Sequence, residues 1–250
     1  MENSENSRVK IPAIVHLTRL GYEYLSLKEY KDTSKIHNDT NIFERVFRES
    51  LSKINGRTFS EDDTARLLGE LSNKLANEDL GKAFYQLLLH GVDGARLIDF
   101  EDVSRNTFHV VTELTCQNGE DEFRPDVTLL VNGMPLAFIE VKKPNNREGI
   151  RAEQNRINSR FSKKAFRRFV NITQLMVFSN NMEYDEDEVA PIEGAFYASS
   201  SYDGLFFNRF REEDEGIHSK IPAIDEKIND IICGIGRKPV SGREWKRRSR

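Results

Sequence analysis

Apolar residues recur at helical and strand spacings along this chain of 250 residues. Spacings of three and four residues predict helices, which we place at 11–20, 40–54, 60–75, 76–89, 147–160 and 161–169. Alternating or continuous apolar runs predict strands, which we place at 22–27, 96–100, 107–114, 127–131, 136–141, 175–179 and 195–199. Strands interleaved with helices predict the α/β class with a mixed sheet.

The segment RPDVTLLVNGMPLAFIEVKKP, residues 124–144, carries the strongest local signal. Two apolar runs flank Asn132-Gly133, and an Asn-Gly pair in that setting is typical of a β-hairpin because both residues tolerate positive φ. The second run is apolar on both faces, as expected for a strand in the centre of a sheet. We therefore expect the sheet to be organised around this hairpin.

Three charged residues, Asp126, Glu140 and Lys142, interrupt the apolar hairpin. Charges in a buried strand pair are costly unless they pair with each other or bind a metal. One interpretation is a structural ion pair at the strand ends. The other is a site for metal-dependent phosphodiester hydrolysis, because carboxylates suit Mg²⁺ and a lysine can hold the attacking water or offset charge in the transition state.

The register of the hairpin decides whether Asp126 can lie beside Glu140. A two-residue loop at 132–133 turns Asp126 away from Glu140, whereas a three-residue loop at 132–134 places the two residues opposite each other. The glycine in the loop and the proline after it favour the longer loop. Since a shift of one residue exchanges the faces of a strand, a metal site requires the longer loop or a β-bulge before Leu136.

The PD at 125–126 and the EVK at 140–142 resemble the PD-(D/E)xK nuclease superfamily. The whole hairpin resembles the amino-terminal nuclease domain of the R subunit of type I restriction enzymes. Further similarity lies in LTRLGYEYL (17–25), RLIDFEDVSRNTFHVVTEL (96–114), Gln154 and QLMVFSNN (174–181). The resemblance implies a restriction-endonuclease-like core in which helices flank a central mixed sheet.

The resemblance also implies the activity of a type I site-specific deoxyribonuclease that cuts double-stranded DNA. Asp126, Glu140, Lys142 and Gln154 would be the catalytic residues. Mg²⁺, with Mn²⁺ as a substitute, would be held by the first two carboxylates and the backbone carbonyl of Val141.

This sequence departs from the family pattern at two positions. Relatives usually carry a glutamate on the first helix that reaches toward the metal, but residues 8–13 contain none. Relatives also usually have a tyrosine four residues after the glutamine, where this chain has Asn158. We therefore assign no ligand on the first helix and no partner to Gln154.

Basic residues recur at about every fourth position after residue 155. They are candidates for binding the DNA backbone, the alternative being an ordinary solvated face; they include Arg156, Arg160, Lys163, Lys164 and Arg167. The net charge of −4 disfavours a protein that coats nucleic acid but allows a nuclease with a local basic surface.

The resemblance implies partners, namely the methyltransferase and specificity subunits of a type I restriction-modification complex. ATP would act only through a motor region, because the phosphate-binding motif G-x-x-x-x-G-K-[ST] does not occur here. We expect an endonuclease domain at 1–235 with a helical insertion at about 39–90, followed by a basic tail or truncated linker at 236–250. The alternatives are a stand-alone repair or resolvase-like nuclease and a non-catalytic docking module of the complex.

Other sequence features indicate a cytoplasmic protein. Cys116 and Cys233 have no metal-ligand spacing and suit a reducing compartment. No apolar run is long enough to cross a membrane, and the polar amino terminus lacks the apolar core of a signal peptide.

Overall fold

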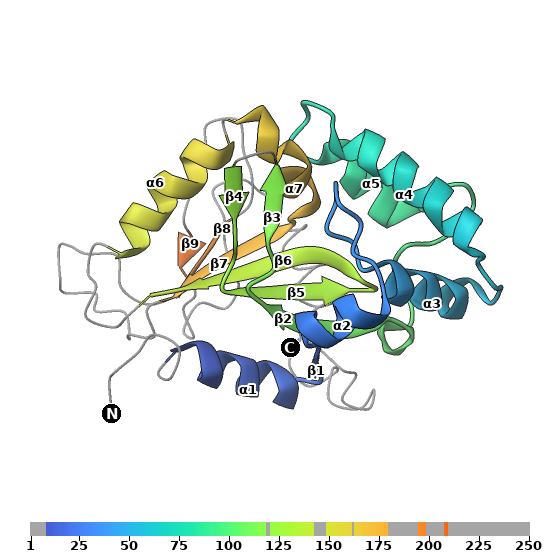
Figure 1. The fold of residues 1–250 in the computed structure, drawn as a ribbon, viewed down its shortest axis with the longest axis horizontal. Helices are drawn as coiled ribbons and strands as arrows, with labels where there is room; N and C mark the ends of the chain where they lie inside the picture. The colour runs from blue at the N-terminus through green and yellow to red at the C-terminus, as the bar shows by residue number, and fades with distance from the viewer. Residues whose placement is uncertain are drawn as a thin grey trace, which may run out of the picture.

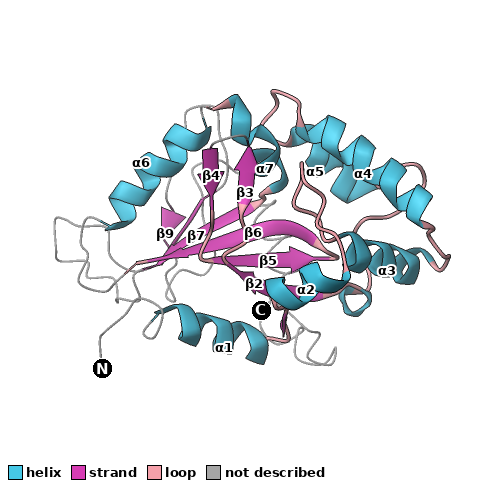
Figure 2. Cartoon of the chain, in the orientation of Figure 1, coloured by secondary structure: helices cyan, strands magenta, loops and turns pink. Residues whose placement is uncertain are grey.

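A computed structural model describes residues 9–118, 121–142, 149–161, 163–179, 195–198 and 208–209. Its helices flank a mixed sheet, which confirms the predicted fold class (Figures 1 and 2). The predicted tail at 236–250 and Cys233 lie outside these residues, and Cys116 is a buried free thiol. In the described ranges, no helix is both long and apolar enough to span a membrane.

Most helical elements agree in place with the sequence-based expectation, but the helices at 27–33 and 103–105 were not predicted, and the first of them begins at the last residue of the predicted strand at 22–27. The helical elements are α1 (Ile11–Arg19), α2 (Leu27–Thr33), α3 (Glu44–Asn55), α4 (Glu61–Leu75), α5 (Lys82–His90), η2 (Val103–Arg105), α6 (Gly149–Phe161), η3 (Lys164–Phe166) and α7 (Arg167–Ile172). In the view of Figure 1, α1 lies below the strands while α6 and α7 lie above them.

In the part of the chain that the structure describes, seven strands form the main sheet, in the order β1-β2-β5-β6-β7-β8-β9. The strands are β1 (Glu23–Tyr24), β2 (Phe108–Thr112), β5 (Val127–Val131), β6 (Met134–Val141), β7 (Leu175–Ser179), β8 (Ala195–Ala198) and β9 (Asn208–Arg209). A separate two-stranded sheet joins β3 (Cys116–Asn118) to β4 (Asp121–Phe123). The hairpin of β5 and β6 is central, as expected, and β6 pairs in parallel with β7.

The hairpin reaches its register through a bulge and not through the longer loop that we favoured. Leu130 pairs with Pro135, whereas Leu129 pairs with Ala137, so Leu136 is the extra residue. The favoured three-residue loop is therefore wrong, because the turn itself contains only residues 132 and 133, and the alternative of a bulge in this part of the hairpin is confirmed. Beyond the bulge, the pairs from Leu129–Ala137 to Val127–Ile139 have the register that places residue 126 beside residue 140.

The side chain of Asn132 explains why the short turn is favoured. Asn132 is completely buried and has a positive φ of 52°. Its Oδ1 accepts a hydrogen bond from the amide of Thr107 (2.8 Å), and its Nδ2 donates to the carbonyl of Leu97 (2.9 Å) and to Oδ1 of Asn106 (2.8 Å). These partners fix the turn against a segment that is distant in sequence.

The predicted strand at 96–100 is wrong. The amide of Arg96 donates to Oδ1 of Asn55 (2.8 Å), and the amide of Asp99 donates to Oδ1 of Asn106 (2.9 Å). Side chains therefore satisfy backbone groups that a neighbouring strand would otherwise pair with.

Among the described residues, three apolar clusters contact the hairpin: one packs Leu130 against Tyr30 of α2 and Val46 of α3, and the other two hold the hairpin between layers of helices. Of these two, one joins α3, α4 and α5 to the sheet and includes Phe47, Leu71, Phe84, Val127 and Leu129. The other joins α6 to β6 and β7 and includes Phe138, Ile157, Phe166, Met176 and Phe178. Because Phe138 and Glu140 share a face of β6, this second cluster positions α6 beside the charged end of the strand.

Candidate active site

Asp126 and Glu140 lie at the same end of the central hairpin. Val127 of β5 pairs with Ile139 of β6. Asp126 comes directly before Val127, and Glu140 comes directly after Ile139, so the two residues are neighbours across the hairpin. Oδ2 of Asp126 accepts a hydrogen bond from the amide of Val141 (2.9 Å). The bulged register therefore brings the Asp126 carboxylate to the end of β6.

Lys142 joins this strand end to α6. Its Nζ donates to Oε1 of Glu140 (2.9 Å) and lies 3.2 Å from Oε2 of Glu153. Glu153 is 1% exposed, although it is a carboxylate. One ammonium group therefore bridges a carboxylate of the sheet and a carboxylate of the helix.

Glu153 is a site residue that our reading of the sequence missed. Its spacing from Ile150 and Ile157 places it on the apolar face of α6, and a charged residue on that face was the signal. Besides Lys142, it forms ion pairs with Arg156 and with Arg160, whose Nη1 lies 3.7 Å from Oε1. Its neighbour Gln154 lies in α6, but the structure does not describe the Gln154 side chain.

The electrostatics of the site favour a bound cation. Burial raises the pKa of Glu140 to about 7, the nearby Glu153 and Asp126 carboxylates add to this rise, and Lys142 opposes it. Oε2 of Glu140 is buried and has no hydrogen-bond partner in the described part of the chain. A buried, unpaired carboxylate oxygen is a suitable ligand for a hard cation.

The pKa of Lys142 is raised despite burial. Burial alone would lower it, but the carboxylates of Glu140 and Glu153 more than offset that effect. Lys142 therefore remains a protonated, positively charged hydrogen-bond donor at neutral pH.

The titration of Glu140 predicts how stability depends on pH. Because the folded-state pKa is raised from 4.5 to about 7, the stabilisation by the neutral carboxyl is fully present below pH 4.5 and is lost as the pH rises through about 7. Glutamine stays neutral at both pH values. The free energy of unfolding of Glu140→Gln should therefore exceed that of the native protein by about 3 kcal/mol at pH 8, and by much less at pH 5. Urea unfolding in the presence of a chelator measures both values.

Glu61→Gln is the control for this prediction, because Glu61 is an exposed carboxylate on α4 whose side chain is 86% accessible. It should change stability equally at both pH values. A gain for Glu140→Gln that is the same at pH 5 and pH 8 would show that Glu140 does not titrate as its burial implies.

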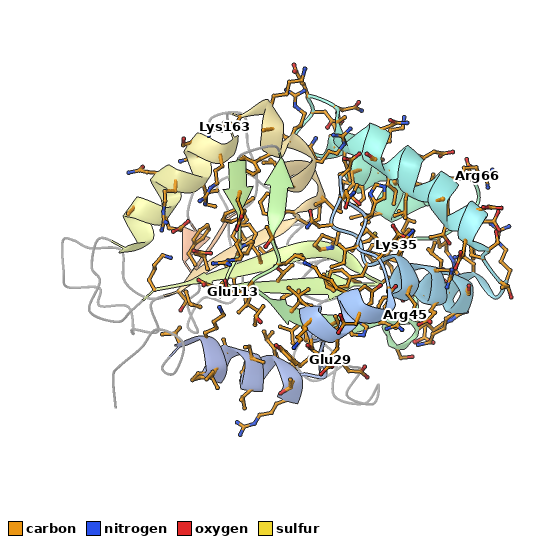
Figure 3. All side chains as sticks on the ribbon, in the orientation of Figure 1. Glu29, Lys35, Arg45, Arg66, Glu113 and Lys163 are labelled. Carbon is orange, nitrogen blue, oxygen red and sulfur yellow. The ribbon has the colours of Figure 1, made fainter. Side chains whose placement is uncertain are left out.

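A second lysine, the helical residue directly before α1, contacts the site. Lys10 is only 7% exposed, forms an ion pair with Glu113, and places its Nζ 3.7 Å from Oδ1 of Asp126. Nε of Arg124 lies 2.9 Å from the other oxygen of Glu113. Figure 3 labels Glu113, which in this view lies at the strands above α1. The stretch in which relatives usually carry a glutamate thus contributes a cation here.

The five candidate DNA-binding residues do not form one continuous stripe. Arg156, Arg160 and Lys163 line a pocket of about 420 Å³ together with Glu122, and Lys163, labelled in Figure 3, lies just beyond α6. The guanidinium of Arg160 also stacks on the ring of Phe123 at 4.2 Å.

The two remaining candidates, Lys164 and Arg167, do not line that pocket. Lys164 is exposed at the start of η3. Arg167 pairs with Glu78 at 2.6 Å, a contact that links α7 to the loop between α4 and α5.

The described residues contain no group of three or more histidine, cysteine, aspartate or glutamate side chains arranged to hold a metal ion. The two carboxylates of Asp126 and Glu140 therefore need a further ligand that is not an acidic side chain. Mg²⁺ commonly takes one or two carboxylates and completes its shell with water or other oxygens, so this pair suits that ion.

The chain is similar in sequence to known proteins. Residues 2–186 match the family model described as "Type I restriction enzyme R protein N terminus". The chain is 30% identical over 182 residues to the type I restriction enzyme EcoprrI endonuclease subunit of Escherichia coli, covering 68% of this chain and 54% of that protein.

Two other relatives also match more than half of the chain. The MjaIXP endonuclease subunit of Methanocaldococcus jannaschii is 26% identical over 203 residues, covering 72% of this chain. The type I restriction enzyme SauCOLORF180P endonuclease subunit of Staphylococcus aureus is 26% identical over 176 residues, covering 67% of this chain. This chain spans 19% of the length of the archaeal relative and 17% of the staphylococcal one.

Proposed function

Because the chain belongs to the family of type I restriction enzyme R protein amino-terminal regions, we propose that it is the Mg²⁺-dependent endonuclease domain of such a subunit. Its reaction is the hydrolysis of phosphodiester bonds in double-stranded DNA. The observation that carries this proposal is the placement of Asp126, Glu140 and Lys142 together at one end of the central hairpin.

The residues present suit a magnesium ion. Oε2 of Glu140 is buried without a hydrogen-bond partner among the described residues, and the Asp126 carboxylate reaches the same strand end. These two carboxylates and the backbone carbonyl of Val141 would hold Mg²⁺ or Mn²⁺. When bound, the ion would polarise the phosphoryl oxygen and lower the pKa of a water molecule.

Lys142 provides the positive charge beside the metal position, and Glu153 pairs with it. Because the pKa of Lys142 is raised, its ammonium acts as a hydrogen-bond donor and not as a general base. It can orient the attacking water and stabilise the charge that develops on the phosphoryl oxygens. Glu153 is a positioning residue, since it holds the Lys142 ammonium from the α6 side at 3.2 Å.

The pocket that contains Arg156, Arg160 and Lys163 is the proposed contact with the DNA backbone. Lys164 extends this surface, whereas Arg167 contributes less because it is paired with Glu78. Gln154 would help to order the site. The specificity and methyltransferase subunits would supply recognition of the target sequence. A motor region would supply ATP-driven translocation.

A calorimetric titration with Mn²⁺ tests the metal site in this chain. We expect the native chain to bind Mn²⁺ and Asp126→Asn to bind it at least about tenfold more weakly, because a charged oxygen ligand is lost. Glu61→Gln, which removes an exposed carboxylate elsewhere, should bind like the native chain. Absence of Mn²⁺ binding to the native chain, or equal affinity in Asp126→Asn, would overturn the proposal.

A further inference from the structure

A buried ammonium group, that of Lys10, lies beside one carboxylate oxygen of Asp126. Oδ1 of Asp126 lies 3.7 Å from Nζ of Lys10, while Oδ2 accepts the hydrogen bond from the amide of Val141. Lys10 is 7% exposed, so its ammonium is largely shielded from water. The two oxygens of Asp126 thus have different neighbours, and one of these neighbours is a cation.

Glu113 holds Lys10 in this position. One carboxylate oxygen of Glu113 contacts the Lys10 ammonium, and the other lies 2.9 Å from Nε of Arg124. The amide of Glu113 also donates to the backbone carbonyl of Asp126 (3.3 Å), which ties the end of β2 to the residue before β5. The position of the Lys10 ammonium is therefore fixed from two sides.

The charges of the four side chains around Lys10 sum to zero. Lys10 and Arg124 carry two positive charges, and Glu113 and Asp126 carry two negative charges. A divalent cation that approached from the Lys10 side would meet an ammonium group and no net negative charge. In contrast, Oε2 of Glu140 has no hydrogen-bond partner among the described residues.

We propose that the Lys10 ammonium takes the place of a second divalent cation beside Asp126, so that the site binds a single metal ion between Asp126 and Glu140. This inference rests on the proposed function, because it assumes that the two carboxylates hold a metal. Lys10 is then a positioning residue: it orients the Asp126 carboxylate and sets the number of ions that bind.

The test is the stoichiometry of Mn²⁺ binding, measured by calorimetry and by the electron paramagnetic resonance of bound Mn²⁺. We expect about one ion in the native chain and in Lys10→Arg, which keeps the charge, and about two in Lys10→Glu. Lys28→Glu, on the exposed surface of α2, is the control for a change in overall charge and should bind about one ion.

Lys10→Met keeps the test decisive if Lys10→Glu fails to fold, because a neutral side chain of similar length adds no further negative charge. We expect Lys10→Met to gain a second ion that binds at least about tenfold more weakly than the first. A native chain that binds two ions overturns the inference, as do folded Lys10→Glu or Lys10→Met proteins that bind only one. A native chain that binds none overturns the proposed function itself.

Discussion

Replacing Asp126, Glu140 or Lys142 with alanine should lower DNA cleavage by the assembled restriction enzyme by about a hundredfold or more in each case. Asp126 and Glu140 would supply the charged oxygens that hold the metal, and Lys142 lies 2.9 Å from Glu140 as the adjacent hydrogen-bond donor. Under the proposed function each would contribute to stabilising the transition state, and such contributions are worth several kcal/mol. Linearisation of a circular plasmid measures the loss.

ATP hydrolysis by the same assembled enzyme is the control, because a misfolded domain would also impair assembly. We expect the three variants to hydrolyse ATP at about the native rate while cleavage is lost. Glu61→Ala removes an exposed carboxylate on α4 and should cleave normally. Cleavage within about tenfold of the native rate in any one of the three variants would contradict the role given to that residue.

Gly133→Ala should destabilise the chain by about 3 kcal/mol. Gly133 has a φ of 79°, and a Cβ there would lie 2.8 Å from the backbone nitrogen of Phe47 and 2.9 Å from the carbonyl oxygen of Phe43. Both contacts are with the backbone at the start of α3, so neither can be relieved by rotating a side chain. The amide of Phe43 also donates to the carbonyl of Gly133 (2.9 Å), so displacing the turn would break a hydrogen bond.

Gly56→Ala separates the cost of the left-handed backbone conformation from the cost of the steric contacts with α3. Gly56 has a similar φ of 63°, but a Cβ there would meet no atom within 4 Å. We expect a loss of about 1 kcal/mol, from the backbone conformation alone. Urea unfolding of both variants gives the comparison, and equal losses would show that close packing of the turn on α3 has no energetic consequence.

The hairpin and its charged residues could be predicted because their signals are local. An Asn-Gly pair between apolar runs defines the turn, and the spacing of Glu140 and Lys142 places them on one face. The bulge could not be read in the same way. The short turn is stabilised by the contacts of Asn132 with Leu97, Asn106 and Thr107, which are distant in sequence.

Of the other site residues, Glu153 could have been predicted from the sequence and Lys10 could not. Glu153 had a signal, since a carboxylate on the apolar face of α6 requires buried partners. Lys10 had none, because its contact with Glu113 joins residues 103 positions apart. The error at 96–100 has a related cause: the side chains of Asn55 and Asn106 satisfy backbone amides there, and no apolar spacing indicates this.

The measurement that tests the central claim most directly is anomalous scattering from Mn²⁺ in crystals of this chain. The account predicts a manganese peak whose nearest protein oxygens belong to the carboxylates of Asp126 and Glu140 and to the backbone carbonyl of Val141, at about 2.1–2.2 Å. A manganese peak bound only by other residues would contradict the account. So would the absence of a peak at these carboxylates in crystals grown with saturating Mn²⁺.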